Sequence, residues 1–319
     1  MFKYVRVQIL YPCRARCAWC STHHKNPLFR HLYDTGVAET VHRFYIQVIR
    51  DLQPEQVFVS GGEPLLYPQI AGFLNAIADA TQQINLFTSY QYSQEACDRM
   101  PFGQMPLEKI VLTHTCICFL QDRWPELTAG FPFERYVENI RTVARLPVRK
   151  RFKFILNHAD LDKEIALFQE RLALDHTFEL GLKVINEQGG VLNRQAIEQT
   201  RDLAHARARA LEQLVDGAGW GRASFMPGSL ETMAPLLVDG DHGRCRYRRK
   251  PLELRFALYK ADTTDQVLKY RYCPYFPSDS GYRFHIGRDD TYKLQKNFRR
   301  GDFRDHCSRC RFLTHYGPL

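Results

Sequence analysis

The sequence has no apolar run that approaches the roughly 18 residues needed to span a membrane. It also lacks a signal peptide, because the opening MFKYVRVQIL is short and alternates apolar with polar residues. Internal repeats and low-complexity tracts are absent as well. These absences disfavour a membrane-bound or exported protein and predict a soluble protein of the cytoplasm.

The composition is that of a globular protein, and its charge is unevenly distributed. A chain of 319 residues with 45% hydrophobic residues can bury a large core and suits one α/β barrel with an appendage. The net charge is +9: residues 241–319 hold 18 Lys and Arg against 9 Asp and Glu, whereas residues 1–240 hold 26 of each. Such a basic region can bind nucleic acid, an acidic peptide or a phosphorylated molecule, or it can offset the charge of a thiolate-ligated metal.

Ten cysteines in a chain without an export signal favour metal ligation or catalysis over disulfide bonds, because the cytosol keeps thiols reduced. They form two clusters and three separate residues. The first cluster is Cys13, Cys17 and Cys20, the second is Cys245, Cys273, Cys307 and Cys310, and the others are Cys97, Cys116 and Cys118.

Strand-like and helix-like segments alternate along the first part of the chain. Strands are predicted at 4–10, 56–60, 84–89, 109–115, 153–157 and 180–185, and amphipathic helices at 37–52, 67–81, 92–99, 133–145 and 161–173. This order predicts an α/β fold with a parallel sheet, open or closed into an incomplete barrel.

The second part begins with a helix at 193–216 that ends at Asp216-Gly217, followed by a Gly-, Ser- and Pro-rich linker over 217–239. Two hairpin-like units come after it, one with its turn at 261–266 and one with its turn at 288–290. The predicted domains are therefore 1–216 and 240–319.

The first cysteine cluster follows the first predicted strand. Thiolates ligate iron–sulfur clusters and structural zinc. Three cysteines leave one iron of a [4Fe–4S] cluster without a protein ligand, whereas a zinc site could take His23 or His24 as its fourth ligand.

The spacing Cys13-x3-Cys17-x2-Cys20, with Trp19 before the third cysteine, resembles the radical S-adenosylmethionine (radical SAM) superfamily. A second match, Gly61-Gly62-Glu63-Pro64 after the second strand, resembles the GGEP motif of that family. The resemblance implies a partial (β/α)6 barrel of the TIM type. It also implies that the open iron binds SAM, that residues 61–64 hold the SAM amino group, and that SAM is cleaved to a 5′-deoxyadenosyl radical.

Four further positions are carried over from the family. Thr88 and Ser89 stand where relatives contact the SAM carboxylate or ribose, Asn157 resembles another SAM contact, and Trp19 would lie by the adenine. Strand-end capping is the alternative for Thr88, Ser89 and Asn157, and core packing is the alternative for Trp19.

The second cysteine cluster, interleaved with the two hairpins, resembles the SPASM and twitch auxiliary-cluster domains of the superfamily. The resemblance implies a small α+β domain with one [4Fe–4S] cluster whose irons are all ligated by Cys245, Cys273, Cys307 and Cys310. Such a saturated cluster would transfer electrons, and nearby Arg and Lys residues could raise its potential or form a docking surface. A zinc ribbon built on the last two cysteines is the alternative.

The separate cysteines lie in different contexts. Cys97 falls in a predicted helix and is expected to be inert, whereas Cys116 and Cys118 follow the fourth strand at the edge where parallel sheets bind ligands. Either one could donate hydrogen to a substrate radical, as in peptide epimerases of the superfamily, or be a small core residue.

The sequence thus predicts a radical SAM oxidoreductase or maturase with SAM, two [4Fe–4S] clusters and a donor such as flavodoxin or ferredoxin. The favoured reaction is oxidative modification or cross-linking of a ribosomally made peptide. The alternatives are a dehydrogenase or epimerase of a sugar- or nucleotide-like small molecule, and a non-catalytic zinc or iron–sulfur protein that binds nucleic acid.

Overall fold

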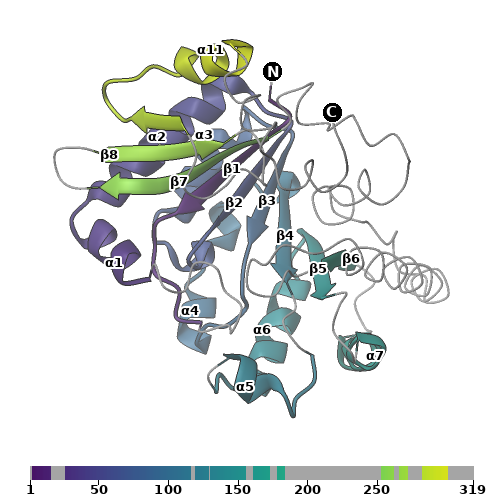
Figure 1. The fold of residues 1–319 in the computed structure, drawn as a ribbon. Helices are drawn as coiled ribbons and strands as arrows, with labels where there is room; N and C mark the ends of the chain where they lie inside the picture. The colour runs from purple at the N-terminus through teal and green to yellow at the C-terminus, as the bar shows by residue number, and fades with distance from the viewer. Residues whose placement is uncertain are drawn as a thin grey trace, which may run out of the picture.

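The computed structural model describes residues 2–15, 26–115, 119–128, 130–155, 161–172, 178–183, 253–261, 266–271 and 282–300. Six parallel strands form its centre: β1 (Tyr4–Ile9), β2 (Gln56–Gly61), β3 (Gln83–Phe87), β4 (Ile110–Thr115), β5 (Arg149–Ile155) and β6 (Phe178–Lys183). Each pairs in parallel with its neighbour in sequence. Strands β1 to β4 converge toward their amino ends and fan out toward their carboxyl ends (Figure 1). Every strand overlaps its predicted range, and the partial (β/α)6 barrel is confirmed.

Helices connect these strands. Those predicted at 37–52, 67–81, 92–99, 133–145 and 161–173 are confirmed as α2 (Val37–Leu52), α3 (Ile70–Ala78), α4 (Gln94–Asp98), α6 (Phe133–Ala144) and α7 (Leu161–Leu172). The structure adds the helices α1 (Asn26–Asp34) and α5 (Trp124–Thr128) and the 3-10 turns η2 (Pro64–Leu66), η3 (Phe102–Gln104) and η4 (Leu107–Lys109). Within the described residues, none of the helices has both the length and the apolar character that a membrane crossing needs.

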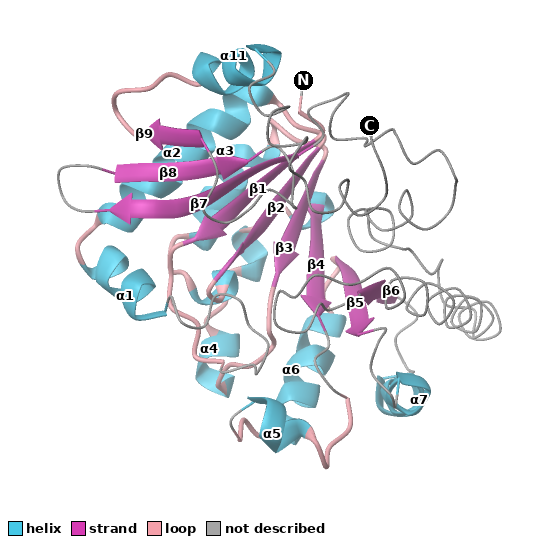
Figure 2. Cartoon of the chain, viewed as in Figure 1, coloured by secondary structure: helices cyan, strands magenta, loops and turns pink. Residues whose placement is uncertain are grey.

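The core lies between the sheet and the helices. In β1, alternation buries Val5, Val7 and Ile9 completely, whereas Tyr4, Arg6 and Gln8 are only partly buried. Helices α2 and α3 lie behind the strands in Figure 2. We call the face toward these helices the outer face and the face of Tyr4, Arg6 and Gln8 the inner face.

The strands near the end of the chain extend the same sheet. Strand β7 (Glu253–Ala261) runs parallel to β1, and β8 (Gln266–Arg271) and β9 (Tyr282–His285) follow antiparallel. The strand order is therefore β6-β5-β4-β3-β2-β1-β7-β8-β9. Phe44 of α2 packs against Phe256 and Phe284, with ring centroids 5.6 and 4.7 Å apart, so one helix covers both parts of the sheet.

The first predicted hairpin is confirmed as β7–β8, but the second is wrong. After β9 the chain turns and forms helix α11 (Tyr292–Arg300) instead of a return strand. Asp290 accepts a hydrogen bond from the Lys293 backbone N–H, and Asp289 pairs with Lys293 at 2.6 Å, so both acidic residues of the turn stabilise the start of a helix. The predicted helix at 193–216 and linker at 217–239 lie outside the described residues.

Candidate functional site

The candidate site lies where β1, β2 and β3 end. Cys13 follows β1, Gly61 ends β2 and residues 62–64 follow it, and Thr88 and Ser89 follow β3. Parallel α/β sheets place their ligands at this edge, because the connecting loops converge there. The structure thus brings together three of the segments predicted from sequence.

The two glycines of the second motif allow it to pack directly on the start of the cysteine loop. A Cβ on Gly62 would lie 1.8 Å from the Tyr11 carbonyl oxygen and 3.0 Å from the Cys13 nitrogen. Gly61 has φ +130°, and a Cβ there would lie 2.2 Å from the Ile9 carbonyl oxygen. The resemblance implied that these residues hold SAM, and in the structure the two glycines also approach the protein's own backbone closely.

Glu63 links the ends of β2 and β3. Its Oε2 accepts hydrogen bonds from the Ser89 backbone N–H at 2.7 Å and from the Ser89 hydroxyl at 2.6 Å, and its Oε1 accepts one from the Leu65 N–H at 3.3 Å. The residue is 1% exposed. Burial raises the pKa of the Glu63 carboxyl group, and the hydrogen bonds from Ser89, Thr88 and Leu65 only partly oppose this rise.

A buried hydrogen-bond network holds Thr88, the residue that precedes Ser89 at the end of β3. The backbone of Thr88 donates to the Thr113 carbonyl, and the Thr88 carbonyl accepts a bond from Nδ1 of His114 at 2.8 Å. The second ring nitrogen of His114 bonds the Tyr136 hydroxyl at 2.7 Å. This network fixes the end of β3, and Thr88 and Ser89 both have hydrogen-bond partners within the protein.

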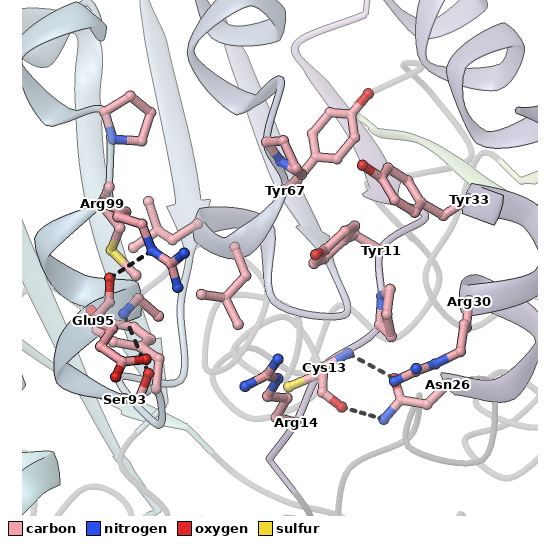
Figure 3. Close-up of a pocket in the computed structure, with 18 of the residues that line it drawn as sticks. Tyr11, Cys13, Arg14, Asn26, Arg30, Tyr33, Tyr67, Ser93, Glu95 and Arg99 are labelled. Carbon is pink, nitrogen blue, oxygen red and sulfur yellow. Dashed lines mark hydrogen bonds between the residues drawn. The ribbon is translucent and has the colours of Figure 1, made fainter.

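Asn26 at the start of α1 forms two hydrogen bonds with the backbone of Cys13. Its Oδ1 accepts a hydrogen bond from the Cys13 backbone N–H at 3.0 Å, and its Nδ2 donates to the Cys13 carbonyl at 2.7 Å (Figure 3). The two bonds join positions 13 and 26, the two ends of the segment that contains Cys17 and Cys20. This residue was not predicted from the sequence, because an asparagine at a helix start is common and ordinarily caps the helix alone.

His42 of α2 supports the end of β1. Its Nε2 accepts a hydrogen bond from the Leu10 N–H at 2.9 Å, and its ring packs edge-on against Tyr67 with centroids 4.8 Å apart. Burial lowers the pKa of His42 to about 3. The imidazole is therefore neutral at the point where the chain enters the cysteine loop.

A pocket of about 1420 Å³ opens beside Cys13 between α1 and α4. Tyr11, Tyr33 and Tyr67 form an aromatic wall, with the rings of Tyr11 and Tyr33 4.9 Å apart and nearly perpendicular. Arg14 lies beside Cys13 and Arg99 faces them from across the pocket (Figure 3). The pocket thus presents a thiol, aromatic rings and cationic groups together.

The remaining predicted site residues lie outside the described residues. They are Cys17, Trp19, Cys20, His23, His24, Cys116, Cys118, Asn157, Cys245, Cys273, Cys307 and Cys310. In the described ranges no group of three or more potential metal ligands comes together, since Cys13 alone of the first cluster falls within them. Cys97 is buried in α4, as expected of an inert thiol.

Comparison with known proteins gives structural but not sequence relatives. No protein-family model and no curated protein matches the chain. The structure is similar to Streptococcus suis SuiB bound to S-adenosylmethionine, with a TM-score of 0.64, 12% identity and coverage of 98% of this chain and 71% of SuiB. It is also similar to SuiB bound to the precursor peptide SuiA, with a TM-score of 0.63, 12% identity and coverage of 92% and 64%.

The chain therefore spans about two thirds of the length of SuiB. At this identity the likeness concerns the backbone alone. The protein has the α/β partial-barrel fold that the radical SAM resemblance implied, in the form seen in SuiB.

Proposed function

We propose that this protein is a radical SAM enzyme that modifies a ribosomally made peptide. One observation supports the proposal above all: Gly62 packs on Tyr11 and Cys13 with no space for a side chain, so the GGEP-like turn lies directly against the start of the cysteine loop. The fold shared with a SAM-bound protein agrees with this site.

In this proposal Cys13, Cys17 and Cys20 ligate a [4Fe–4S] cluster that has one open iron. The turn at Gly61, Gly62, Glu63 and Pro64 holds the SAM amino group. Glu63 fits that role, because a buried carboxylate with a raised pKa gains from a cationic partner. Ser89 orients the carboxylate through its two hydrogen bonds.

Three further contacts belong to the proposal. Thr88 and Asn157 hold polar groups of SAM, and Trp19 packs by its adenine. When bound, the cluster and SAM supply a 5′-deoxyadenosyl radical that takes a hydrogen atom from the substrate. The chain's part is to hold Cys13 through Asn26 and to keep Glu63 out of water.

The proposed second centre is an auxiliary [4Fe–4S] cluster on Cys245, Cys273, Cys307 and Cys310. Four protein ligands would leave it no site for substrate, and when present it would supply an acceptor for the second electron of an oxidation. Flavodoxin or ferredoxin supplies the first electron. Cys116 or Cys118 would donate hydrogen if the reaction is an epimerisation.

A peptide substrate is proposed because the protein shares its fold with SuiB, whose structure has been determined with a precursor peptide bound. The small-molecule alternative predicts no product from peptides. The two are separated by incubating the enzyme with candidate peptides and measuring the product mass, which falls by two hydrogens in an oxidation or cross-link.

The decisive test is SAM cleavage by anaerobically reconstituted protein with a strong reductant. We expect 5′-deoxyadenosine and about eight irons per chain, as two [4Fe–4S] clusters require. Replacing Cys13, Cys17 and Cys20 with Ala should abolish cleavage and remove about half of the iron. Cys97→Ala is the matched control and should change neither. Absence of 5′-deoxyadenosine with about four irons or fewer would contradict the two-cluster enzyme and favour a non-catalytic metal protein.

A further inference from the structure

The turn that connects β3 to α4 contains a strained residue. Tyr90 has a φ of 56°, in the left-handed region that a bulky side chain adopts only at a cost in free energy. Its ring is buried, stacks on the Phe152 ring with centroids 5.8 Å apart and planes 2° apart, and meets His114 edge-on at 5.1 Å. A strained conformation of this kind persists only where the surrounding structure holds it in place.

This turn carries the donors that reach Glu63. Ser89, directly before Tyr90, donates its backbone N–H and its hydroxyl to Glu63 Oε2. The same hydroxyl oxygen accepts a hydrogen bond from the Gln91 N–H at 3.2 Å, and the Tyr90 N–H donates to Thr88 Oγ1 at 3.3 Å. A change in the backbone of Tyr90 would therefore move the Ser89 donors away from Glu63.

Asn139 of α6 holds the other side of the turn. Its Nδ2 donates to the Tyr90 carbonyl at 2.9 Å and to the Tyr92 carbonyl at 2.8 Å. An amide nitrogen has two N–H groups, so these two bonds use the full donor capacity of the side chain. Asn139 is completely buried, and its Oδ1 has no hydrogen-bond partner within the described ranges.

Packing alone does not explain an asparagine at this position. Its neighbours on the buried side of α6 include Tyr136, Val137, Ile140 and Val143. Burial of an amide whose oxygen is unsatisfied costs free energy that an apolar side chain would not cost. The two bonds to the turn offset this cost, and through the turn they connect α6 to the candidate site.

We propose that Asn139 is a positioning residue of the SAM site. By holding the carbonyls of Tyr90 and Tyr92, it keeps the turn in its left-handed form. This form directs both donors of Ser89 to Glu63, the carboxylate proposed to hold the SAM amino group. The inference rests on the SAM site proposed above and adds to it a residue of α6 that lies outside both sequence motifs.

A double-mutant cycle in SAM affinity tests the proposal. Calorimetry of anaerobically reconstituted protein gives the SAM Kd of the parent, Asn139→Ala, Glu63→Gln and the double variant. We expect Asn139→Ala to raise the Kd about five- to tenfold in the parent, within the range of couplings in one hydrogen-bond network. In the Glu63→Gln background it should raise the Kd less than about twofold, because both changes act through the same carboxylate.

Hydrogen exchange measured by mass spectrometry, on the same protein without SAM, reports on the turn itself. Asn139→Ala should speed amide exchange over residues 86–92 about tenfold, because two buried carbonyls lose their donor. Val143→Ala is the matched control, since it leaves a cavity on the buried side of α6 one turn from Asn139. It should lower the melting temperature but change neither the exchange over 86–92 nor the SAM Kd.

Asn139→Ser keeps one donor, so it is the variant to use if Asn139→Ala does not fold, and it should raise the Kd by a smaller factor. An unchanged SAM Kd in the folded Asn139 variants overturns the proposal and leaves Asn139 a residue of the fold alone. Equal increases in the parent and Glu63→Gln backgrounds overturn it as well. A parent protein that binds no SAM contradicts the proposed function and this inference with it, so the two failures are distinguishable.

Discussion

Acidification is expected to destabilise the entrance to the cysteine loop through His42. This side chain is 3% exposed, and burial lowers its pKa from 6.5 to about 3. Its Nε2 must stay unprotonated to accept the Leu10 N–H, and its Nδ1 has no hydrogen-bond partner among the described residues. Protonation would therefore place two N–H donors against each other in the core.

The sign and size of the effect follow from proton linkage. Between about pH 6.5 and 3 the unfolded chain binds a proton at His42 and the folded chain does not, so stability falls as the pH falls through this window. The slope reaches about 1.4 kcal/mol per pH unit. From pH 7 to pH 5, His42 should reduce the free energy of unfolding by about 2 kcal/mol.

Urea titrations of anaerobic protein at pH 7 and pH 5 measure this loss. His42→Gln keeps an acceptor for Leu10 but does not titrate, so its loss between the two pH values should be about 2 kcal/mol smaller than that of the parent protein. His31→Gln changes an exposed histidine of α1 and should leave the loss as it is. A His42→Gln variant with the same loss as the parent would refute the reasoning. So would a His42 NMR resonance that titrates near pH 6.5.

Three other variants test the site itself. Gly62→Ala should cost about 2 kcal/mol or more and impair cluster assembly, since its Cβ would lie 1.8 Å from the Tyr11 oxygen. Gly72→Ala in α3 meets nothing within 4 Å and should stabilise by about 0.5–1 kcal/mol, so equal melting temperatures for the two would contradict this account. Asn26→Ala should speed iron loss on gel filtration, because it removes both hydrogen bonds to Cys13. Unchanged iron retention would show that these two bonds do not help to hold the iron. Glu63→Gln should weaken SAM binding about tenfold or more in calorimetry, the scale of a lost charge-assisted contact, and an unchanged Kd would remove Glu63 from the site.

The barrel could be predicted from the sequence because its outer-face residues alternate with polar ones in a regular pattern, as Val5, Val7 and Ile9 do in β1. Strand β5 was predicted to start at 153, whereas it starts at Arg149. The prediction missed the first residues of the strand, Arg149, Lys150 and Arg151, because they are charged. Charged residues conceal a strand from any search for apolar runs.

Local motifs were easier to predict than the contacts that join them. The GGEP-like turn and Cys13 were singled out separately, but their contact depends on Gly62 approaching Tyr11 across 51 residues of chain. Asn26 and His42 were missed for the same reason, since each acts by a hydrogen bond to a backbone group in another segment. Such bonds leave no spacing in the sequence to recognise.

The basic residues are distributed differently when they are counted across the paired strands instead of along the chain. Counted along the chain, residues 1–240 are neutral and the excess lies entirely in the last 79 residues. Counted across the sheet, Arg6, Arg149 and Arg151 from the neutral part share a face with Arg255 and Arg283 from the basic part. The neutrality of the first part arises because its acidic residues stand elsewhere, for example on the exposed surface of α2 and α6.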